Sequence, residues 1–455
     1  MLGILGIVAI ACFLAVVVRP VVGAYLLLFT TPLIAGVARG SMLVRPNEAL
    51  LVVVACALSV RAVLLMLSRR YHPPRFDRMD MALLVLVASG SVLPMVWLAI
   101  RQQPVSQDDL LYAAVLIKYY VLFRVFRVTV VTTAQVMTCL WMSITSAVIE
   151  GLIAIFQVTK LFGVPAFLHA YYDQPYSGTV TVISDRGTST LASAFGHADL
   201  MIMNLMIVLA VSRLRPDRAR LLLGIAGLYV TGIIACGEFS GYIGFTVALL
   251  VFALLSGISL RQAFPYMLSI GVVMAIPLWS VLEKRFGVLL GQGEVPMSWK
   301  GRLDDLREFF LPRLLEGGNW LLGVQPAPRV LAPEAWRTHV YVESGYVWLP
   351  WIGGVPFVLA FFYFVASTLA TLRSIIRARQ DAAGVAATAA FCYVATMVAL
   401  MTFDPHITMR GTADLMFPLI AMSLVGQQSE VYRPQRALGT QWRSSAAHPA
   451  RLQEG

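Results

Sequence analysis

The sequence predicts an all-α protein, a polytopic membrane bundle of about 12–13 transmembrane helices with a large outer loop that carries amphipathic helices. Composition and patterning lead to this fold class. Hydrophobic residues make up 58% of the 455 residues, charged residues make up 13%, and the mean hydropathy is +0.76. Soluble domains carry about twice that share of charged residues. Long apolar runs also recur along the chain between short polar segments.

The predicted spans are apolar runs of about 16–28 residues, long enough to cross a hydrocarbon core if tilted or tightly packed. The first run has no charged segment before it and no small-residue cleavage site, so we expect a retained span rather than a signal peptide. The runs lie near residues 2–18, 21–38, 47–67, 79–100, 109–126, 129–158, 198–212, 221–237, 239–258, 264–282, 345–372, 384–403 and 411–426.

Arginine residues set the predicted orientation. Nineteen of them fall in segments on one side of the membrane, against four in the short loops opposite, Arg39, Arg45, Arg101 and Arg410. The positive-inside rule makes the first side cytoplasmic and places the long loops 159–197 and 283–344 outside. Only Arg19 orients the first hairpin, so a cytoplasmic N-terminus with twelve spans stays open. The net charge of +11 therefore reflects topology rather than nucleic-acid binding.

We expect residues 1–426 to form a single transmembrane bundle and 427–455, which are polar and lack an apolar face, to form a disordered cytoplasmic tail. The five cysteines have no C-x-x-C spacing, so we expect neither a disulfide framework nor a zinc site. Arg61 and Lys118 lie inside predicted spans. Arg61 is near enough to the cytoplasmic end to reach the interface, whereas pairing and a functional role are equally open for Lys118.

Polar residues on the predicted outer side concentrate in "SDRGTSTLASAFGHADL" (184–200), "CGEFSGY" (236–242), the loop 283–346 and "FDPHITMRG" (403–411). Helix bundles build sites by bringing such distant segments together. Arginines bind phosphate oxygens, and Glu or His supplies a base, so this composition favours a phosphate-bearing substrate. We expect one cavity to be bordered by Asp185, Arg186, His197, Glu238, Arg302, Arg337, His339, Glu343, His406 and Arg410.

Simpler interpretations apply to several of these residues. Leu303, Leu306, Phe310 and Leu314 are spaced as one face of an amphipathic helix lying on the outer surface. Glu238 sits in so short a turn that a role at a helix end is as plausible as a catalytic one. No metal-binding or nucleotide-binding motif is present, so we expect no metal and no cofactor.

Three stretches, in this order, carry a likeness to a known family. "DRGTSTLASAFGHADLMIMNLMIVLAV" places Arg186 ahead of a Ser/Thr-rich segment and a new span, and "GIIACGEFSGYIGFTVALLVFALL" joins two spans. "GRLDDLREFFLPRLLEGGNWLLGV" and "HVYVESGYVWLPWIGG" give an arginine, an amphipathic helix, a Gly-rich turn and a polar-aromatic segment before a span. Over roughly residues 180–370, this arrangement resembles the O-antigen ligase and O-antigen (exopolysaccharide) polymerase superfamily of bacterial envelope glycan enzymes.

The resemblance implies a polysaccharide polymerase in the bacterial cytoplasmic membrane that joins undecaprenyl-diphosphate-linked repeat units by glycosyl transfer at the outer face. It implies a metal-independent enzyme, and as partners the lipid-linked donor, a growing glycan acceptor, membrane lipids, and chain-length regulator and flippase proteins. An O-antigen ligase, which transfers the glycan to a lipid-A core, stays open. So does a lipid-linked glycan transporter, although that class predicts inverted repeats and charges on both sides of the membrane.

The resemblance also assigns roles to residues. It implies that the substrate diphosphate is bound by Arg186, Arg302 and Arg337, that the catalytic base is Glu343 or His339, and that Glu238, His197 and Arg410 are second-tier candidates. Two departures stand out. Glu343 occupies the position where the family has histidine, with His339 one helical turn upstream, and Ser240 or a neighbour occupies the second arginine position.

Overall fold

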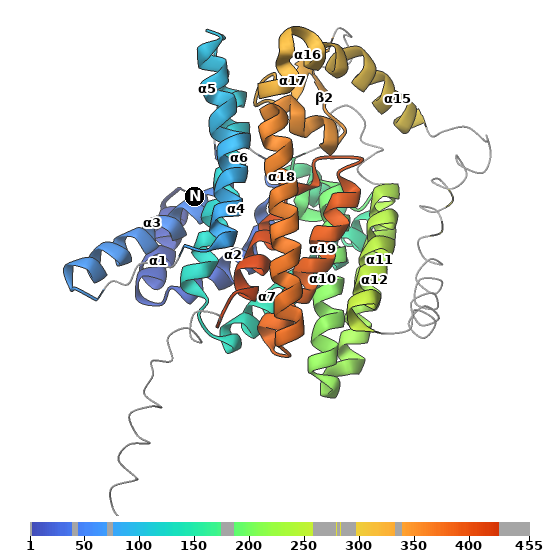
Figure 1. The fold of residues 1–455 in the computed structure, drawn as a ribbon. Helices are drawn as coiled ribbons and strands as arrows, with labels where there is room; N and C mark the ends of the chain where they lie inside the picture. The colour runs from blue at the N-terminus through green and yellow to red at the C-terminus, as the bar shows by residue number, and fades with distance from the viewer. Residues whose placement is uncertain are drawn as a thin grey trace, which may run out of the picture.

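The computed structural model describes residues 2–38, 44–70, 76–173, 186–257, 297–332 and 339–426, with Trp279 and Glu283. Its described part is an all-α bundle, as predicted, with one two-stranded hairpin (Figure 1). Eight helices in this part are long and apolar enough to cross a membrane, and three shorter helices are also apolar. The chain is therefore a polytopic membrane protein.

Helices of the N-terminal half follow the predicted runs. α4 (Arg78–Val87) continues through a π-helical turn, η1 (Ala88–Val92), into α5 (Leu93–Ile100), and together they cover the predicted span 79–100. The remaining elements are α1 (Leu2–Val18), α2 (Val21–Ile34), α3 (Pro46–Leu67), α6 (Gln107–Thr129), α7 (Thr133–Val158), α8 (Val164–Tyr171) and η2 (Ser189–Leu191).

The C-terminal half holds the most deeply buried helices and the extramembrane elements. The run 264–282 lies almost wholly outside the described residues, as does the tail 427–455. The elements are α10 (Ala194–Leu214), η3 (Pro216–Arg218), α11 (Ala219–Cys236), α12 (Phe239–Ser256), α15 (Met297–Asp305), η4 (Leu306–Phe310), α16 (Leu311–Leu315), η5 (Glu316–Gly318), α17 (Asn319–Leu322), β1 (Arg329–Leu331), β2 (His339–Tyr341), α18 (Gly345–Ala378), α19 (Ala382–Leu400), η6 (His406–Thr408) and α20 (Ala413–Ser423).

Short polar residues fix where several helices begin. Asp77 accepts hydrogen bonds from the backbone amides of Met79 and Asp80 at the start of α4, and Ser106 caps α6 in the same way. Asp381 accepts two backbone amides at the start of α19. These caps satisfy donors that have no partner within the first turn of a helix.

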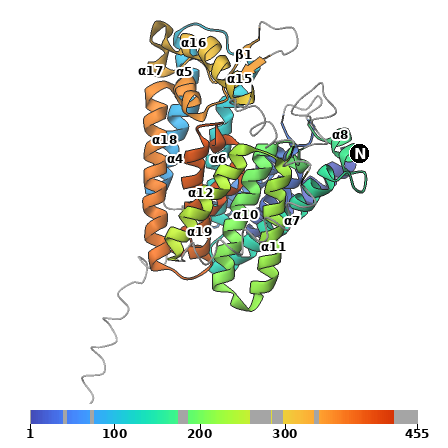
Figure 2. The same cartoon turned by 90° about the vertical axis from the view of Figure 1, so that its right-hand side faces the viewer.

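The centre of the bundle is formed by α10 and α19. α10 packs against α7, α11, α12 and α19, and it is buried on nearly every side, as expected for a helix that is apolar all round. In Figure 2, α10, α11 and α12 run side by side, and α18 forms the opposite edge of the bundle. A polar residue on α10 is therefore held inside the protein rather than against lipid.

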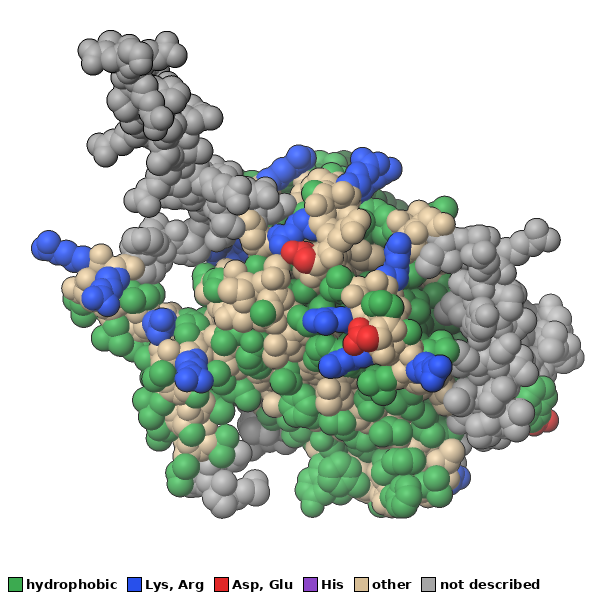
Figure 3. All heavy atoms as spheres, turned by 90° about the horizontal axis from the view of Figure 1, so that it is seen from below, with side chains coloured by type: hydrophobic (Ala, Val, Ile, Leu, Met, Phe, Trp, Pro, Cys, Tyr) green, Lys and Arg blue, Asp and Glu red, His purple; other side chains and the backbone are tan. Residues whose placement is uncertain are grey.

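The bundle has two distinct ends. At one end, here called the basic end, α6, α18 and α20 end and α4 begins. Arg127 on α6 binds Asp77 before α4 at 2.7 Å and reaches the Leu424 carbonyl after α20, and Arg379 after α18 donates to the Val425 carbonyl. Figure 3 looks onto this end and shows blue basic side chains spread over it, with few red acidic ones. At the other end, here called the loop end, α15, α16, α17 and the hairpin lie over the start of α18 (Figure 1). This arrangement matches the predicted grouping of the loops.

The amphipathic segment of the loop 283–344 is helical, but it is divided into α15, the π-helical η4 and α16. Phe310 and Leu314 are buried as predicted, whereas Leu303 is half exposed. The Phe310 ring packs edge-on against Trp351 of α18, with ring centroids 4.9 Å apart. This contact anchors the loop helices to the bundle.

A kink in α18 receives α17. Gly354 has φ +61°, and a Cβ there would lie 2.2 Å from the carbonyl oxygen of Leu321. Gly323 in turn approaches the carbonyl of Ile352 so closely that a Cβ would lie 2.1 Å from it. Only glycine combines this backbone conformation with this close approach.

The two basic residues inside predicted spans have structural partners. Arg61 donates to the carbonyl of Val17 at 2.6 Å, at the end of α1, as its reach toward the interface predicts. Lys118 on α6 pairs with Asp414 in the first turn of α20 at 3.2 Å. The geometry therefore favours internal pairing for Lys118.

Candidate functional site

Charged residues from five separate segments meet at the loop end, where they form what is here called the loop-end cluster. Arg302 contacts both Glu343 and Asp404, and the Asp404 carboxyl interacts electrostatically with Glu238 and His406. The cluster consists of Arg186, Asp199, Glu238, Arg302, Glu343, Asp404 and His406. Five of these, Arg186, Glu238, Arg302, Glu343 and His406, were predicted to border the site.

Arg302 on α15 lies between two carboxylates. Its Nε is 2.8 Å from Oε2 of Glu343, and its Nη2 is 3.4 Å from Oδ2 of Asp404. The guanidinium also lies over the ring of Phe195, 5.6 Å from the centroid. The Glu343 side chain is 45% exposed, whereas that of Asp404 is 13% exposed. One carboxylate is therefore open to solvent, and the other supports the arginine from within.

Backbone contacts hold this pair of carboxylates in place. The amide of Tyr346, in the first turn of α18, donates to the carbonyl of Met401 at 3.1 Å. Gly345 lies against the segment after α19, where a Cβ would be 2.8 Å from the carbonyl oxygen of Asp404. Glu343 and Asp404 thus come from two segments that pack directly against each other.

Burial changes the protonation of Asp404. It raises the pKa of this carboxyl from 3.8 to about 6, with Arg302 and His406 opposing the shift and Glu343 and Glu238 adding to it. Oδ2 of Asp404 is buried, and although Nη2 of Arg302 lies 3.4 Å away, no donor among the described residues makes a hydrogen bond to it. The pKa of Asp404 therefore lies close to neutral pH, where both the protonated and the charged form of its carboxyl are populated.

A second, fully buried chain of polar groups lies behind Asp404. Nδ1 of His406, on η6, is 2.6 Å from Oδ2 of Asp199 on α10, and the Tyr393 hydroxyl of α19 donates to the same oxygen at 3.1 Å. Burial lowers the pKa of His406, but the carboxylates of Asp199 and Asp404 outweigh it, so the net pKa is raised. These hydrogen-bonded side chains link the centre of the bundle to the loop end.

Arg186 and Glu238 form a further ion pair of the cluster, at 2.6 Å. Glu238 follows Gly237, whose φ of +62° makes the tight turn between α11 and α12. Arg186 lies beside this turn because the backbone amide of the next residue, Gly187, donates to the carbonyl of Ala235 at 2.9 Å. Arg186, which was predicted as a site residue, is thus paired with the acid in the turn between α11 and α12.

The Ser/Thr-rich segment after Arg186 is anchored inside the bundle. Oε1 of Gln157 on α7 accepts the amides of Thr188 and Ser189, both at 2.9 Å. The hydroxyl of Thr190 donates to the buried carboxyl of Glu150 on the same helix. These contacts fix where Arg186 emerges at the loop end.

Two of the predicted histidines, His197 and His339, do not join the cluster in the expected way, whereas His406 belongs to it. His197 lies inside α10 with no exposure, and its Nδ1 is 2.8 Å from the Ser189 hydroxyl. His339 lies on β2, so the expectation that it sits one helical turn before Glu343 is wrong. His339 pairs with Leu331 of β1. The chain between His339 and Glu343 is therefore extended rather than helical. Alternating polar and β-branched residues in "HVYVE" were the available signal.

Arg410 and Arg337 complete the predicted set. Arg410 lies 3.6 Å from Asp173, which Arg45 also binds at 2.7 Å. This forms a second ion-pair group at the loop end. Arg337 and Asp185 fall outside the described residues.

Sequence reasoning missed Asp199, Asp404 and Tyr393. Asp199 and Asp404 both lie in polar segments identified from the sequence, but neither was assigned to the predicted cavity. An acid inside an apolar run is itself a signal, because a charge at membrane depth is costly without a partner. Glu150, inside the run 129–158, carries the same signal.

No protein-family model matches this chain, and comparison with curated proteins finds no match. In the described part of the chain, no three His, Cys, Asp or Glu side chains lie together in a way that could hold a metal ion.

Proposed function

We propose that the chain is a polysaccharide polymerase that joins undecaprenyl-diphosphate-linked repeat units at the outer face of the bacterial cytoplasmic membrane. An acceptor sugar hydroxyl attacks the anomeric carbon of the donor, the bond from that carbon to the diphosphate breaks, and the lipid diphosphate leaves. The observation that carries this proposal is Arg302, held between the half-exposed Glu343 and the buried Asp404.

Arg302 supplies the positive charge that the leaving diphosphate requires. A guanidinium matches phosphate oxygens with two parallel hydrogen bonds, and such contacts strengthen as charge develops on the leaving group. In the free protein, Glu343 occupies the Nε side of Arg302. We propose that the donor diphosphate displaces Glu343 from this position, while Asp404 keeps the arginine in place from the buried side.

Displacement from Arg302 turns Glu343 into the base. A carboxylate that loses its cation becomes more basic, and it then accepts the proton of the attacking hydroxyl. The base therefore becomes active only when the donor is bound. His339 stays the alternative base, since burial and then the neighbouring Arg329 lower the pKa of its imidazole and so favour the neutral form.

Arg186 is the second cation of the proposed diphosphate site, with Glu238 as its partner in the free protein. Arg337 is kept as a proposed ligand of the diphosphate. Arg410, which lies beside Asp173, stays a second-tier candidate. Arginines rather than a metal ion neutralise the diphosphate in this mechanism. We therefore propose that chain growth continues in the presence of a chelator.

The test is an assay of the purified protein in nanodiscs with lipid-diphosphate-linked oligosaccharide. The expected result is longer lipid-linked glycan, lost in Glu343→Gln and Arg302→Ala and retained in Glu308→Gln, which changes an exposed acid on η4. His339→Ala and Arg186→Ala test the other two assignments, with insertion and folding checked for each variant.

Two other outcomes separate the alternatives. Transfer of glycan to a lipid-A core acceptor, without chain growth, replaces the polymerase with a ligase that uses the same site. No transfer to any acceptor, together with movement of the lipid-linked glycan across liposomes, rejects the transferase in favour of a transporter.

A further inference from the structure

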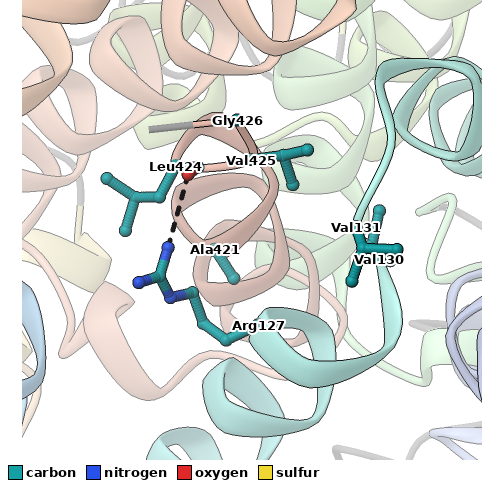
Figure 4. Close-up of a pocket in the computed structure, with 7 residues that line it drawn as sticks. All are labelled: Arg127, Val130, Val131, Ala421, Leu424, Val425 and Gly426. Atoms are coloured by element: carbon teal, nitrogen blue, oxygen red, sulfur yellow. Dashed lines mark hydrogen bonds between the residues drawn. The ribbon is translucent and has the colours of Figure 1, made fainter. Parts of the chain in front are cut away.

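A cavity of about 300 Å³ lies at the basic end, remote from the loop-end cluster. The end of α6, the turn before α7 and the end of α20 surround it, and Figure 4 shows Arg127 and the pair Val130 and Val131 on two sides of the last turn of α20. Backbone polar atoms and Arg127 make up about half of its surface, and the other lining side chains are apolar. The lining residues are Arg127, Val130, Val131, Ala421, Leu424, Val425 and Gly426. Cavities of this size accept small ligands with a few polar groups.

Arg127 holds unused hydrogen-bonding capacity in this cavity. Its side chain is only 5% exposed, and Nη2 binds Asp77 at 2.7 Å. Nη1 reaches the Leu424 carbonyl at 3.5 Å, the outer limit of a hydrogen bond, and Nε has no acceptor in the described part of the chain (Figure 4). A guanidinium has five donors, and leaving one buried without a partner is costly. The site therefore lacks an acceptor, and an anion would supply one.

A second guanidinium reaches the rim of the cavity. Arg379, at the end of α18, donates to the Val425 carbonyl, and a Cβ on Gly426 would lie 2.8 Å from its Nη1. On the other side, Val131 is 60% exposed and Val128 is 38% exposed. Cationic groups thus lie beside an apolar surface, which is the composition that an amphipathic anion fits.

The position of the cavity selects the kind of anion. It lies where α6 and α20 end, among the arginine-rich segments that the positive-inside rule places at the cytoplasmic membrane surface. Anionic phospholipids are enriched at that surface, and basic pockets between transmembrane helices bind their headgroups. We propose that this cavity binds the phosphodiester headgroup of an anionic membrane lipid, with Arg127 on the phosphate and the acyl chains beside Val131.

The test is native mass spectrometry of the delipidated full chain titrated with phosphatidylglycerol or phosphatidylcholine of identical acyl chains. We expect wild type to retain phosphatidylglycerol preferentially, and Arg127→Lys, which keeps the charge but loses the planar fork, to bind it about tenfold more weakly. Val131→Glu adds a negative charge at an exposed position of the mouth and should weaken binding without disturbing the core. Arg220→Gln removes an exposed charge at the same end and should bind as wild type does.

Three results would overturn the proposal. Equal retention of the two lipids would show that binding does not depend on the charge of the headgroup. Unchanged phosphatidylglycerol binding in both Arg127→Lys and Val131→Glu would place any lipid elsewhere. Competition by glycerol phosphate at the same concentration as the lipid would identify a soluble phosphate site, because the acyl chains would then contribute nothing.

Discussion

Arg302 of α15 and Glu343, just before α18, form an ion pair of 2.8 Å between the surface helices and the membrane bundle. The pair has unequal environments, since the Arg302 side chain is 17% exposed and that of Glu343 is 45% exposed. A partly solvated ion pair contributes little to stability, so it exchanges partners at low cost. This property makes the pair suited to a substrate-dependent exchange.

If the donor diphosphate replaces Glu343 on Arg302, Glu343→Gln should lower kcat without raising KM. Loss of the base should lower kcat about 10²–10⁴-fold. The KM for the lipid-linked donor should fall or stay unchanged, because Arg302 no longer has to release a carboxylate before it binds the diphosphate. Steady-state kinetics with a fixed acceptor measure both constants, and Glu308→Gln serves as the control. A raised KM with wild-type kcat would contradict the base assignment.

The raised pKa of Asp404 predicts how stability depends on pH. The carboxyl has a pKa of about 6 in the folded state against 3.8 in its ordinary state, so between those values the folded protein holds a proton that the unfolded chain releases. Stability therefore falls as the pH rises through this window, by up to about 3 kcal/mol. In Asp404→Asn this contribution disappears. Thermal unfolding in detergent at pH 4, 5, 6 and 7 compares the two slopes, and parallel curves would refute the assignment.

Hydrophobic pattern and charge were sufficient to predict most of the fold. Long apolar runs dictate helices because every backbone polar group in a membrane must be paired within the segment. The spacing of Phe310 and Leu314 identified the buried face of the surface helix. The π-helical turns η1 and η4 were not predicted, since they follow from packing rather than from local propensity.

The candidate site was predictable only in part. Arg186, Arg302, Glu238 and Glu343 share one end of the bundle by topology alone, and so they could be grouped from the sequence. Their pairing could not, because which carboxylate meets which arginine depends on how α15 lies over α18. His339 was placed in a helical register because the likeness was followed along the chain, whereas its neighbours pair as a hairpin.

Gly354→Ala should separate the surface helices from the bundle. A side chain at φ +61° and ψ −155°, a region that only glycine adopts readily, costs about 1–3 kcal/mol, and the new Cβ would also lie only 2.2 Å from the Leu321 carbonyl oxygen. We expect faster proteolysis within residues 311–322 and a lowered Tm. Gly224→Ala, in α11 with no atom within 4 Å of its Cβ position, should leave both unchanged. Equal behaviour of the two variants would show that the kink is not required.

The Arg186–Glu238 pair is best tested by a double-mutant cycle, because each charge compensates the other at a position that is largely removed from water. The side chains are 21% and 10% exposed, so either single variant, Arg186→Gln or Glu238→Gln, leaves a charge largely removed from water. Each single change should cost about 3–5 kcal/mol of stability, and the double variant should recover much of that loss. Denaturation in detergent measures the stabilities, and the exposed Asp217→Asn is the control. Additive losses would mean that the two side chains are not coupled. If the double variant recovers stability but not chain growth, the pair serves the proposed diphosphate site rather than the fold alone.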